Sequence, residues 1–219
     1  MPFMRLGTRA AQKTIVLGVT GASGALFARR TLQMLEADAR VGKIHLVISG
    51  AGLKVLRDEL DLEAPRSSSI AAALAGHAVR KTEYLLDSDI GASIASGSYT
   101  HHGMVVIPCS TGCLAQIAHG FSQTLIERAA DVCLKESRQL ILAVRDTPFS
   151  RVHLWNMLLA QEAGAEIFPV MPSYYHRPKT IDDLVTQFCS RLLAHLGLEQ
   201  PSQFRWEGEK PTQKSKVEG

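Results

Sequence analysis

The chain has 219 residues, a formal net charge of +3 at pH 7 and 46% hydrophobic residues, of which few are aromatic. This length suits one well-buried core rather than two full domains. The positive charges form no dense Lys/Arg stripe, which argues against a nucleic-acid partner. No apolar run approaches the roughly 20 residues that span a bilayer, so we expect no membrane span.

The first 13 residues are basic, with Arg5, Arg9 and Lys13 and no acidic residue. They lack the apolar stretch and cleavage site of a secretory signal. The four cysteines form no Cys-x-x-Cys pair, and no histidine spacing completes a zinc site. We therefore expect a basic tail over 1–13, reduced thiols, no metal site and a cytoplasmic location.

From residue 14 onward, short apolar runs alternate with amphipathic stretches of helical period. Residues 61–80 show too little pattern to assign a helix. The predicted strands are 14–19, 44–49, 79–85, 104–108, 140–144 and 165–170. The predicted helices are 25–35, 53–60, 114–118, 124–136, 152–164 and a last one that begins at residue 180.

This alternation is typical of an α/β fold with a doubly wound, mostly parallel sheet and helices on both faces, as in Rossmann-like and flavodoxin-like proteins. The last predicted helix begins at Thr180, whose spacing to Asp183 is typical of a capping box. We assign residues 14–198 to one such domain and 199–219 to a polar C-terminal tail.

Ligands of such sheets bind beyond the carboxyl ends of the strands. After the first strand comes Gly18-Val-Thr-Gly-Ala-Ser-Gly24, whose glycines permit close backbone approach and whose Thr20 and Ser23 offer hydroxyl donors. Its spacing matches neither the dinucleotide fingerprint nor the Walker form. After the second strand, Ser49 stands where a NAD site usually has an acidic residue. The combination favours a mononucleotide such as FMN.

The fourth strand leads into Ser110, Thr111 and Gly112, which predict a second anion-binding helix start. Each of these loops, taken alone, is better explained as an ordinary turn or helix cap. Their recurrence at successive strand ends is what favours a ligand site.

Cationic side chains follow the same strand ends. Arg128 and Lys135 lie seven residues apart on one helix and so share a face. Arg145 follows a buried strand, and Tyr175 and Arg191 come after the last strand. A solvated mixed-charge helix remains an alternative for the first pair. Together, however, these side chains predict a second anionic group beside the cofactor, such as a phosphorylated substrate.

Taken together, the residues resemble the UbiX-type flavin prenyltransferases over about residues 14–206. The motifs that carry the resemblance are Gly-Val-Thr-Gly-Ala-Ser-Gly-Ala (18–25), Val-Ile-Ser (47–49), Ala-Ser-Gly-Ser (95–98), Ile-Pro-Cys-Ser-Thr-Gly (107–112), Glu-Arg-Ala-Ala-Asp-Val-Cys-Leu-Lys-Glu (127–136) and Tyr-His-Arg-Pro (175–178).

The resemblance implies an enzyme that transfers a dimethylallyl group from dimethylallyl monophosphate to reduced FMN without a metal. The product, prenylated FMN, would serve a UbiD-type decarboxylase, including the one of ubiquinone biosynthesis. The resemblance also implies a homo-oligomer, typically a dodecamer.

Residue roles follow from the resemblance, position by position. The implied flavin contacts are Gly21, Ala22, Ser23, Ser49, Ser110, Thr111, Gly112, Cys113 and Arg145. The implied substrate-binding residues are Ser98, Arg128, Lys135, Tyr175, Arg191 and Trp206, the last as an aromatic shield. The implied catalytic residues are Ser23, Glu59, Lys135 and Asp146.

Within the catalytic set, Ser23 and Glu59 would relay protons near the flavin. Asp146 would act as acid or base at the phosphate, although the family usually has a glutamate, one methylene longer, at this position. That departure leaves open a non-catalytic flavin-binding subunit of a decarboxylase. An FMN-dependent cysteine decarboxylase of the same superfamily is the other alternative, but the segment Pro169-Val-Met-Pro-Ser-Tyr-Tyr-His176 lacks the Pro-x-Met-Asn pattern of those enzymes.

Overall fold

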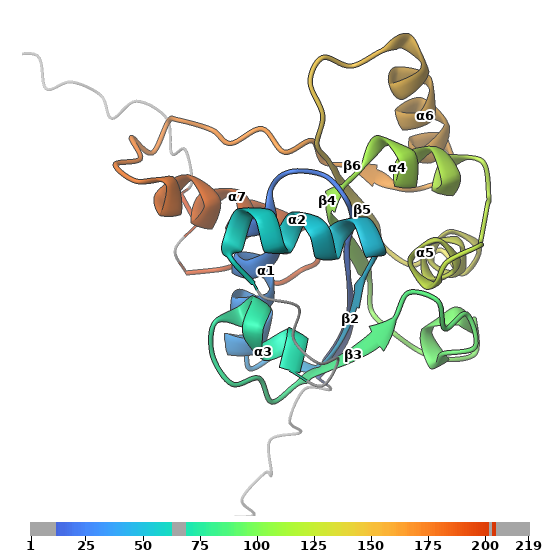
Figure 1. The fold of residues 1–219 in the computed structure, drawn as a ribbon, viewed down its shortest axis with the longest axis horizontal. Coiled ribbons are helices and arrows are strands. Elements are labelled where there is room, and N and C mark those ends of the chain that lie inside the picture. The colour runs from blue at the N-terminus through green and yellow to red at the C-terminus, as the bar shows by residue number, and fades with distance from the viewer. Residues whose placement is uncertain (1–11, 63–68, 202, 205–219) are drawn as a thin grey trace, which may run out of the picture.

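The computed structural model describes residues 12–62, 69–201 and 203–204, and its sheet has six parallel strands in the order β3-β2-β1-β4-β5-β6 (Figure 1). The strands are β1 (Lys13–Val19), β2 (Val41–Ile48), β3 (Thr82–Leu86), β4 (Met104–Cys109), β5 (Leu140–Val144) and β6 (Glu166–Ile167). The helices are α1 (Ala25–Ala37), α2 (Gly50–Leu60), α3 (Ile70–Ala75), the short 3-10 helix η2 (Ser93–Ala95), α4 (Thr111–Ala118), α5 (Leu125–Lys135), α6 (Arg151–Glu162) and α7 (Ile181–His195).

The helices cover both faces of the sheet, which confirms the doubly wound α/β prediction (Figure 1). Alternate residues of β1 belong to different cores, because side chains of a strand point alternately to its two faces. Ile15 and Leu17 pack with α1, α2, α3 and α7, whereas Val16 packs with α4, α5 and α6. None of the described helices is both long enough and apolar enough to cross a membrane.

The structure corrects the predicted sheet and helices near its edges. The predicted last strand is present, but its bounds of 165–170 are too wide, because β6 spans only Glu166–Ile167. Beyond it, Phe168 and Val170 still donate N–H groups to β5, but Pro169 between them has no N–H. Residues 61–80, where the sequence predicted no helix, contain α3. Its short sequence is mostly alanine and shows no clear helical period.

Two helices begin three residues before their predicted starts, at Gly50 in α2 and Thr111 in α4. In each case a serine caps the helix through its side-chain oxygen, which accepts a hydrogen bond from a backbone N–H. The first turns of both helices consist of small residues, so the spacing of large apolar residues does not show where the helices begin. The capping box predicted for Thr180 and Asp183 is confirmed.

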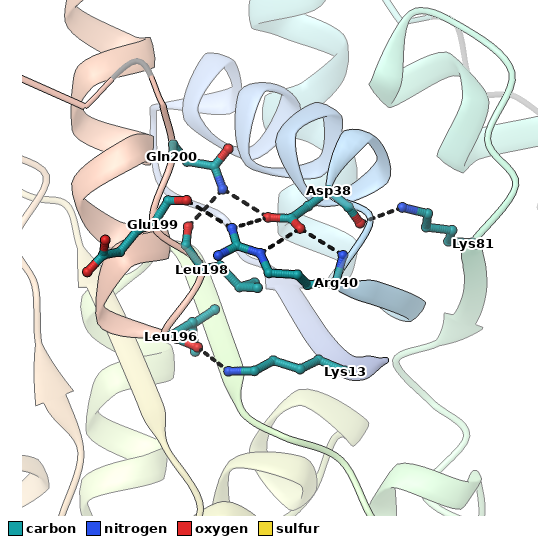
Figure 2. Close-up of polar contacts among 8 residues, drawn as sticks. All are labelled: Lys13, Asp38, Arg40, Lys81, Leu196, Leu198, Glu199 and Gln200. Carbon is teal, nitrogen blue, oxygen red and sulfur yellow. Dashed lines mark hydrogen bonds and ion pairs between the residues drawn. The ribbon is translucent and has the colours of Figure 1, made fainter. Parts of the chain in front are cut away.

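A polar cluster at the amino ends of the strands ties the segment after α7 to the turn between α1 and β2 (Figure 2). The Asp38 carboxylate accepts hydrogen bonds from the guanidinium of Arg40 at 2.6 and 2.9 Å and from Gln200 at 3.1 Å. Arg40 also donates to the carbonyl of Glu199. These bonds from Arg40 outweigh the effect of burial and lower the pKa of Asp38 to about 2.

Replacing Asp38 with Asn is expected to lower the free energy of unfolding by roughly 1–2 kcal/mol at neutral pH, because Arg40 loses its charged acceptor. The pKa of Asp38 is lowered from 3.8 to about 2 on folding. Its stabilisation is therefore present above the unfolded-state value and is lost as the pH falls toward the folded-state value.

Urea unfolding of the wild type and the Asp38→Asn variant at neutral pH and near pH 2 measures this difference. The gap between the two proteins should close in acid. Asp58→Asn, at an exposed carboxylate of α2, is the matched control and should change little at either pH. A gap that stays constant across the pH range would contradict the assignment.

Candidate functional site

The strand order reverses between β1 and β4, and such a switch point is where ligands bind in doubly wound sheets. Thr20 joins the carboxyl ends of the two strands. Its hydroxyl donates to the carbonyl of Pro108 at 2.8 Å and accepts the N–H of Ser110 at 2.8 Å. The side chain is buried, and its single proton is used within the protein. The predicted ligand contact of the Thr20 hydroxyl is therefore wrong, and Thr20 instead fixes the two loops relative to each other.

The loop after β1 holds an internal carboxylate at the start of α1. The N-cap residue, Gly24, has no side chain to cap the helix. Glu59, from the last turn of α2, accepts hydrogen bonds from the N–H of Gly24 at 3.0 Å and of Ala25 at 2.7 Å. The sequence had suggested that these amides would bind a phosphate. They are taken by Glu59, which lies 35 residues along the chain and leaves no local sequence signal.

The Glu59 carboxylate is held in its ionised form. Partial burial raises its pKa, but the Ser23 hydroxyl, the N–H groups of Ala25 and Gly24 and the positive charge of Arg145 together lower it below the usual glutamate value. The structure thus brings three predicted site residues, Ser23, Glu59 and Arg145, to one place at the switch point. An ionised carboxylate hydrogen-bonded to an exposed hydroxyl is suited to accept protons.

The start of α4 offers an open helix N-terminus beside this pair. Ser110 accepts the N–H of Cys113 at 3.2 Å, and Thr111 and Gly112 begin the helix. The first amides of an α-helix have no acceptor within the helix. A Cβ added to Gly112 would meet nothing within 4 Å. A phosphate fits here, because the site offers N–H donors, the positive end of the helix dipole and free space.

Other predicted flavin contacts have clear packing roles in the described structure. The hydroxyl oxygen of Ser49 accepts the N–H of Gly52 at 3.0 Å and so caps α2, although its own proton remains for a ligand. Gly21 packs so closely against Ala51 that a Cβ there would clash. The Cys113 thiol is buried beside the Cys109 thiol, and this contact and its burial raise its pKa. The roles of these residues toward flavin stay predictions.

Asp146 lies at the carboxyl end of β5, next to the start of α4. Its carboxylate accepts a hydrogen bond from the Thr111 hydroxyl at 3.3 Å and another from the N–H of Thr147 at 2.8 Å. Asp146, where the resemblance implies a glutamate, is therefore held at the mouth of the predicted phosphate site. Its chemical role remains a prediction.

The residues predicted to bind the substrate phosphate fall into two groups. In the first, Arg128 donates to the carbonyl of Ala95 at 3.3 Å, and the head group of Lys135 packs against Gly97. The segment that carries Ser98 therefore lies against α5. The alternative of a solvated mixed-charge helix also has support in the structure, since Arg128 pairs with Asp131 and Lys135 pairs with Glu136.

The second group, Tyr175 and Arg191, lines a cavity of about 500 Å³ together with Ser173, Gln187 and Phe204. This cavity includes residues of α7, on the face of the sheet opposite to α5 (Figure 1). The sequence had suggested one phosphate site for both groups, but within a single chain they belong to different faces. Trp206, also predicted here, lies outside the described residues.

Gln187 is a residue of this cavity that the sequence did not single out. It is buried, and its amide donates to the carbonyl of Phe204 at 3.3 Å and accepts the N–H of Phe204 at 2.9 Å. These paired bonds hold Phe204 against α7 as a wall of the cavity. The sequence gives one weak signal for this role: Gln187 is a polar residue next to the apolar stripe of α7.

A scan against family models matches the Flavoprotein family over residues 4–185. Among curated proteins, a flavin prenyltransferase UbiX of Alkalihalophilus pseudofirmus is 43% identical over 89% of this chain and 96% of its own length. The UbiX of Escherichia coli K12 is 40% identical over 90% and 99%. The chain belongs to the UbiX flavin prenyltransferase family.

Solved structures of this family agree in fold. AnUbiX, in complex with FMN and dimethylallyl pyrophosphate, has a TM-score of 0.81 at 38% identity and covers 91% of this chain and 100% of its own. A dodecameric FMN-dependent UbiX-like decarboxylase from Escherichia coli O157:H7 has a TM-score of 0.77 at 40% identity, with coverage of 89% and 100%. An FMN-dependent cysteine decarboxylase, TvaF, is only 13% identical and shows the fold alone.

A further relative, from Saccharomyces cerevisiae, is named flavin prenyltransferase PAD1, mitochondrial, and is 42% identical over 90% of this chain and 76% of its own length. The family thus includes a protein whose name assigns it to mitochondria. The cytoplasmic location expected from the sequence stays a prediction.

Replacing Thr20 with Val is expected to weaken FMN binding several-fold and to lower the free energy of unfolding by roughly 1–3 kcal/mol, because the buried N–H of Ser110 loses its acceptor. Flavin titration and urea unfolding measure both effects. Thr31→Val is the matched control: Thr31 is also buried, but its hydroxyl donates to the Cys189 thiol, away from the site. Equal flavin affinity in the two variants would contradict the role of Thr20.

Proposed function

We propose that the protein is a flavin prenyltransferase that transfers the dimethylallyl group of dimethylallyl monophosphate to reduced FMN. The product, prenylated FMN, would pass to a UbiD-type decarboxylase. The observation that carries this proposal is the Ser23–Glu59 pair at the switch point, in a chain about 40% identical to proteins named flavin prenyltransferases. A carboxylate at the start of α1 suits proton transfer better than phosphate binding.

The flavin phosphate fits the start of α4, where the amides of Thr111 and Gly112 and the hydroxyl of Ser110 converge. Arg145, at the carboxyl end of β5, adds a positive charge on the same side as Glu59. When bound, reduced FMN supplies the nucleophilic ring nitrogen and carbon, N5 and C6, that receive the dimethylallyl group. The residues of this chain hold it and neutralise charge around it.

Cations assist the departure of the substrate phosphate. As the allylic C–O bond breaks, its electron pair stays with the phosphate, and negative charge grows on the phosphate oxygens. Arg128 and Lys135 on α5, or Tyr175 and Arg191 near α7, stabilise that charge with hydrogen bonds that strengthen during the reaction. Asp146, held by Thr111, is placed to exchange a proton with the phosphate.

Ser23 and Glu59 then remove a proton. The Ser23 hydroxyl already bonds the ionised Glu59 carboxylate, so its proton can move to Glu59 as Ser23 accepts another from the ring. Glu59 keeps its place throughout, because the backbone amides of Gly24 and Ala25 bind it in either protonation state.

The decisive assay mixes the full chain with reduced FMN and dimethylallyl monophosphate without oxygen and follows the extracted flavin by absorbance and mass. Prenylated FMN is the expected product, and dimethylallyl pyrophosphate in a parallel reaction tests the choice of donor. Bound FMN without any prenylated product from either donor would favour a non-catalytic subunit. Release of carbon dioxide from a peptidyl cysteine would favour the decarboxylase alternative.

The copies of the chain would assemble through α6. This helix exposes five large apolar side chains, from 37% for Leu159 to 64% for Val152, with Trp155 at 57%. Patches of this kind mark interaction surfaces in soluble proteins. A second copy is the fitting occupant, because a UbiX-like relative of 40% identity is dodecameric. Since α6 begins shortly after Asp146, a copy seated there would border the site.

Replacing Trp155 with Glu is expected to break the assembly into smaller species, because a charge at the centre of an apolar interface is left unpaired. Light scattering coupled to gel filtration measures the mass. Leu26→Glu is the matched control, since Leu26 is an exposed leucine of α1. Dissociation by both variants, or by neither, would contradict an interface at α6.

Replacing Glu59 with Gln is expected to lower kcat by roughly a hundredfold or more while FMN stays bound, because the amide still caps α1 but accepts no proton. The lowered pKa predicts a wild-type kcat that is constant through neutral pH and falls only in acid, below the ordinary value of 4.5, as Glu59 becomes protonated. Stopped-flow kinetics and flavin titration check both points. Asp58→Asn, at the neighbouring exposed carboxylate of α2, should behave as wild type.

A further inference from the structure

The turn that carries Ser98 is fixed through its backbone by two arginines. The carbonyl of Ala95 accepts a hydrogen bond from Arg128 at 3.3 Å. Two residues on, the carbonyl of Gly97 accepts one from Arg138 at 2.6 Å, and the carbonyl of Tyr99 accepts another from the same guanidinium at 2.8 Å. The two carbonyls that flank Ser98 are therefore held by one side chain.

Arg138 is itself rigidly placed. Helix α5 ends at Lys135, and Ser137 adopts a left-handed conformation with φ 52°, which turns the chain back. The N–H of Arg138 then bonds the carbonyl of Cys133 at 2.8 Å. From this fixed backbone the half-buried guanidinium presents a planar set of donors, which matches two carbonyls at once in a way that a lysine cannot.

The geometry of the turn places two hydroxyls side by side. The N–H of Tyr99 closes the turn on the carbonyl of Ser96 at 3.2 Å. The hydroxyls of Ser96 and Ser98, both exposed, are 2.9 Å apart. A second anchor lies at the end of the turn, where the Tyr99 hydroxyl meets the ring of His45, a fully buried residue of β2, at 2.7 Å.

The turn also lies very close to α5. A Cβ added to Gly97 would clash with the charged ends of Lys135 and Glu136. The residue before Ser98 therefore lies beside the ion pair of Lys135 and Glu136, and the lack of a side chain at Gly97 leaves room for these two charged ends. Because Arg138 holds the carbonyl of that same glycine, loss of its guanidinium would free the turn to move away from Lys135.

We propose that Arg138 is a positioning residue for the substrate phosphate. It fixes the turn 96–99 against the end of α5 and so presents the Ser98 hydroxyl, with Ser96 beside it, next to Lys135. In this role Arg138 acts through the turn: its two terminal nitrogens donate to the carbonyls of Gly97 and Tyr99 on either side of Ser98. The inference rests on the proposed function, because it assumes that Ser98 and Lys135 bind the phosphate of the allyl donor.

Arg138→Met keeps the length of the side chain and removes its donors. In the prenylation assay we expect KM for dimethylallyl monophosphate to rise about tenfold, as for the loss of one charge-assisted contact. The dissociation constant of FMN should not change, because the flavin residues belong to other loops. Arg80→Met is the matched control, at an exposed arginine remote from α5.

A double-mutant cycle with Ser98→Ala separates positioning from a general loss of stability. If Arg138 acts through Ser98, the variant that carries both changes should have the same KM as the single variant with the higher KM. Independent, multiplying effects on KM would overturn the inference, and so would an unchanged KM in Ser98→Ala. Arg138→Lys keeps the charge and is expected to recover only part of the loss, so full recovery would mean that charge alone matters.

The outcomes also separate this inference from the proposed function. A wild-type protein that yields no prenylated FMN refutes the function itself. An active wild type, with an Arg138→Met variant that folds and has the wild-type KM, refutes only the role of Arg138. If Arg138→Met proves too unstable to assay, the milder Arg138→Lys carries the same cycle with Ser98→Ala.

Discussion

The hydrogen bonds from the start of α1 to the Glu59 carboxylate organise the candidate site. They place an ionised carboxylate at the N-terminus that follows the glycine loop, where doubly wound proteins often bind a phosphate. The open helix start at α4 is then where we predict that an anion binds at the switch point. Thr20 keeps the two loops in register, so the proton acceptor and the predicted flavin phosphate site belong to one rigid unit.

The amino and carboxyl ends of the strands differ in how their charged side chains are paired. At the amino ends, charged groups are matched within the fold: Asp38 is satisfied by Arg40 and Gln200, and its low pKa reflects that pairing. At the carboxyl ends, Arg145 and Arg191 remain exposed. A fold that satisfies its structural charges at one edge can leave cations at the other edge for an anionic ligand, and this separation is what the proposed chemistry requires.

The cations are also divided between the two faces of the sheet. Arg128 and Lys135 belong to α5, whereas Arg191 belongs to α7 on the opposite face, where Gln187 and Phe204 complete a cavity. The apolar surface of α6 and the dodecameric relative are consistent with our proposal that copies of the chain assemble beside this site. Arg138 shows that positioning within one group depends on backbone contacts as much as on charge.

The sequence by itself determined the α/β class, most strands and the capping box at Thr180, because period and this cap are local properties. It also singled out the residues at the strand ends, from Ser23 to Arg191. Only the tertiary structure decided that Glu59 occupies the start of α1, that Thr20 faces inward and that Arg138 holds the turn of Ser98. Each of these contacts joins residues at least 34 positions apart, and no local pattern specifies which donor will meet which acceptor.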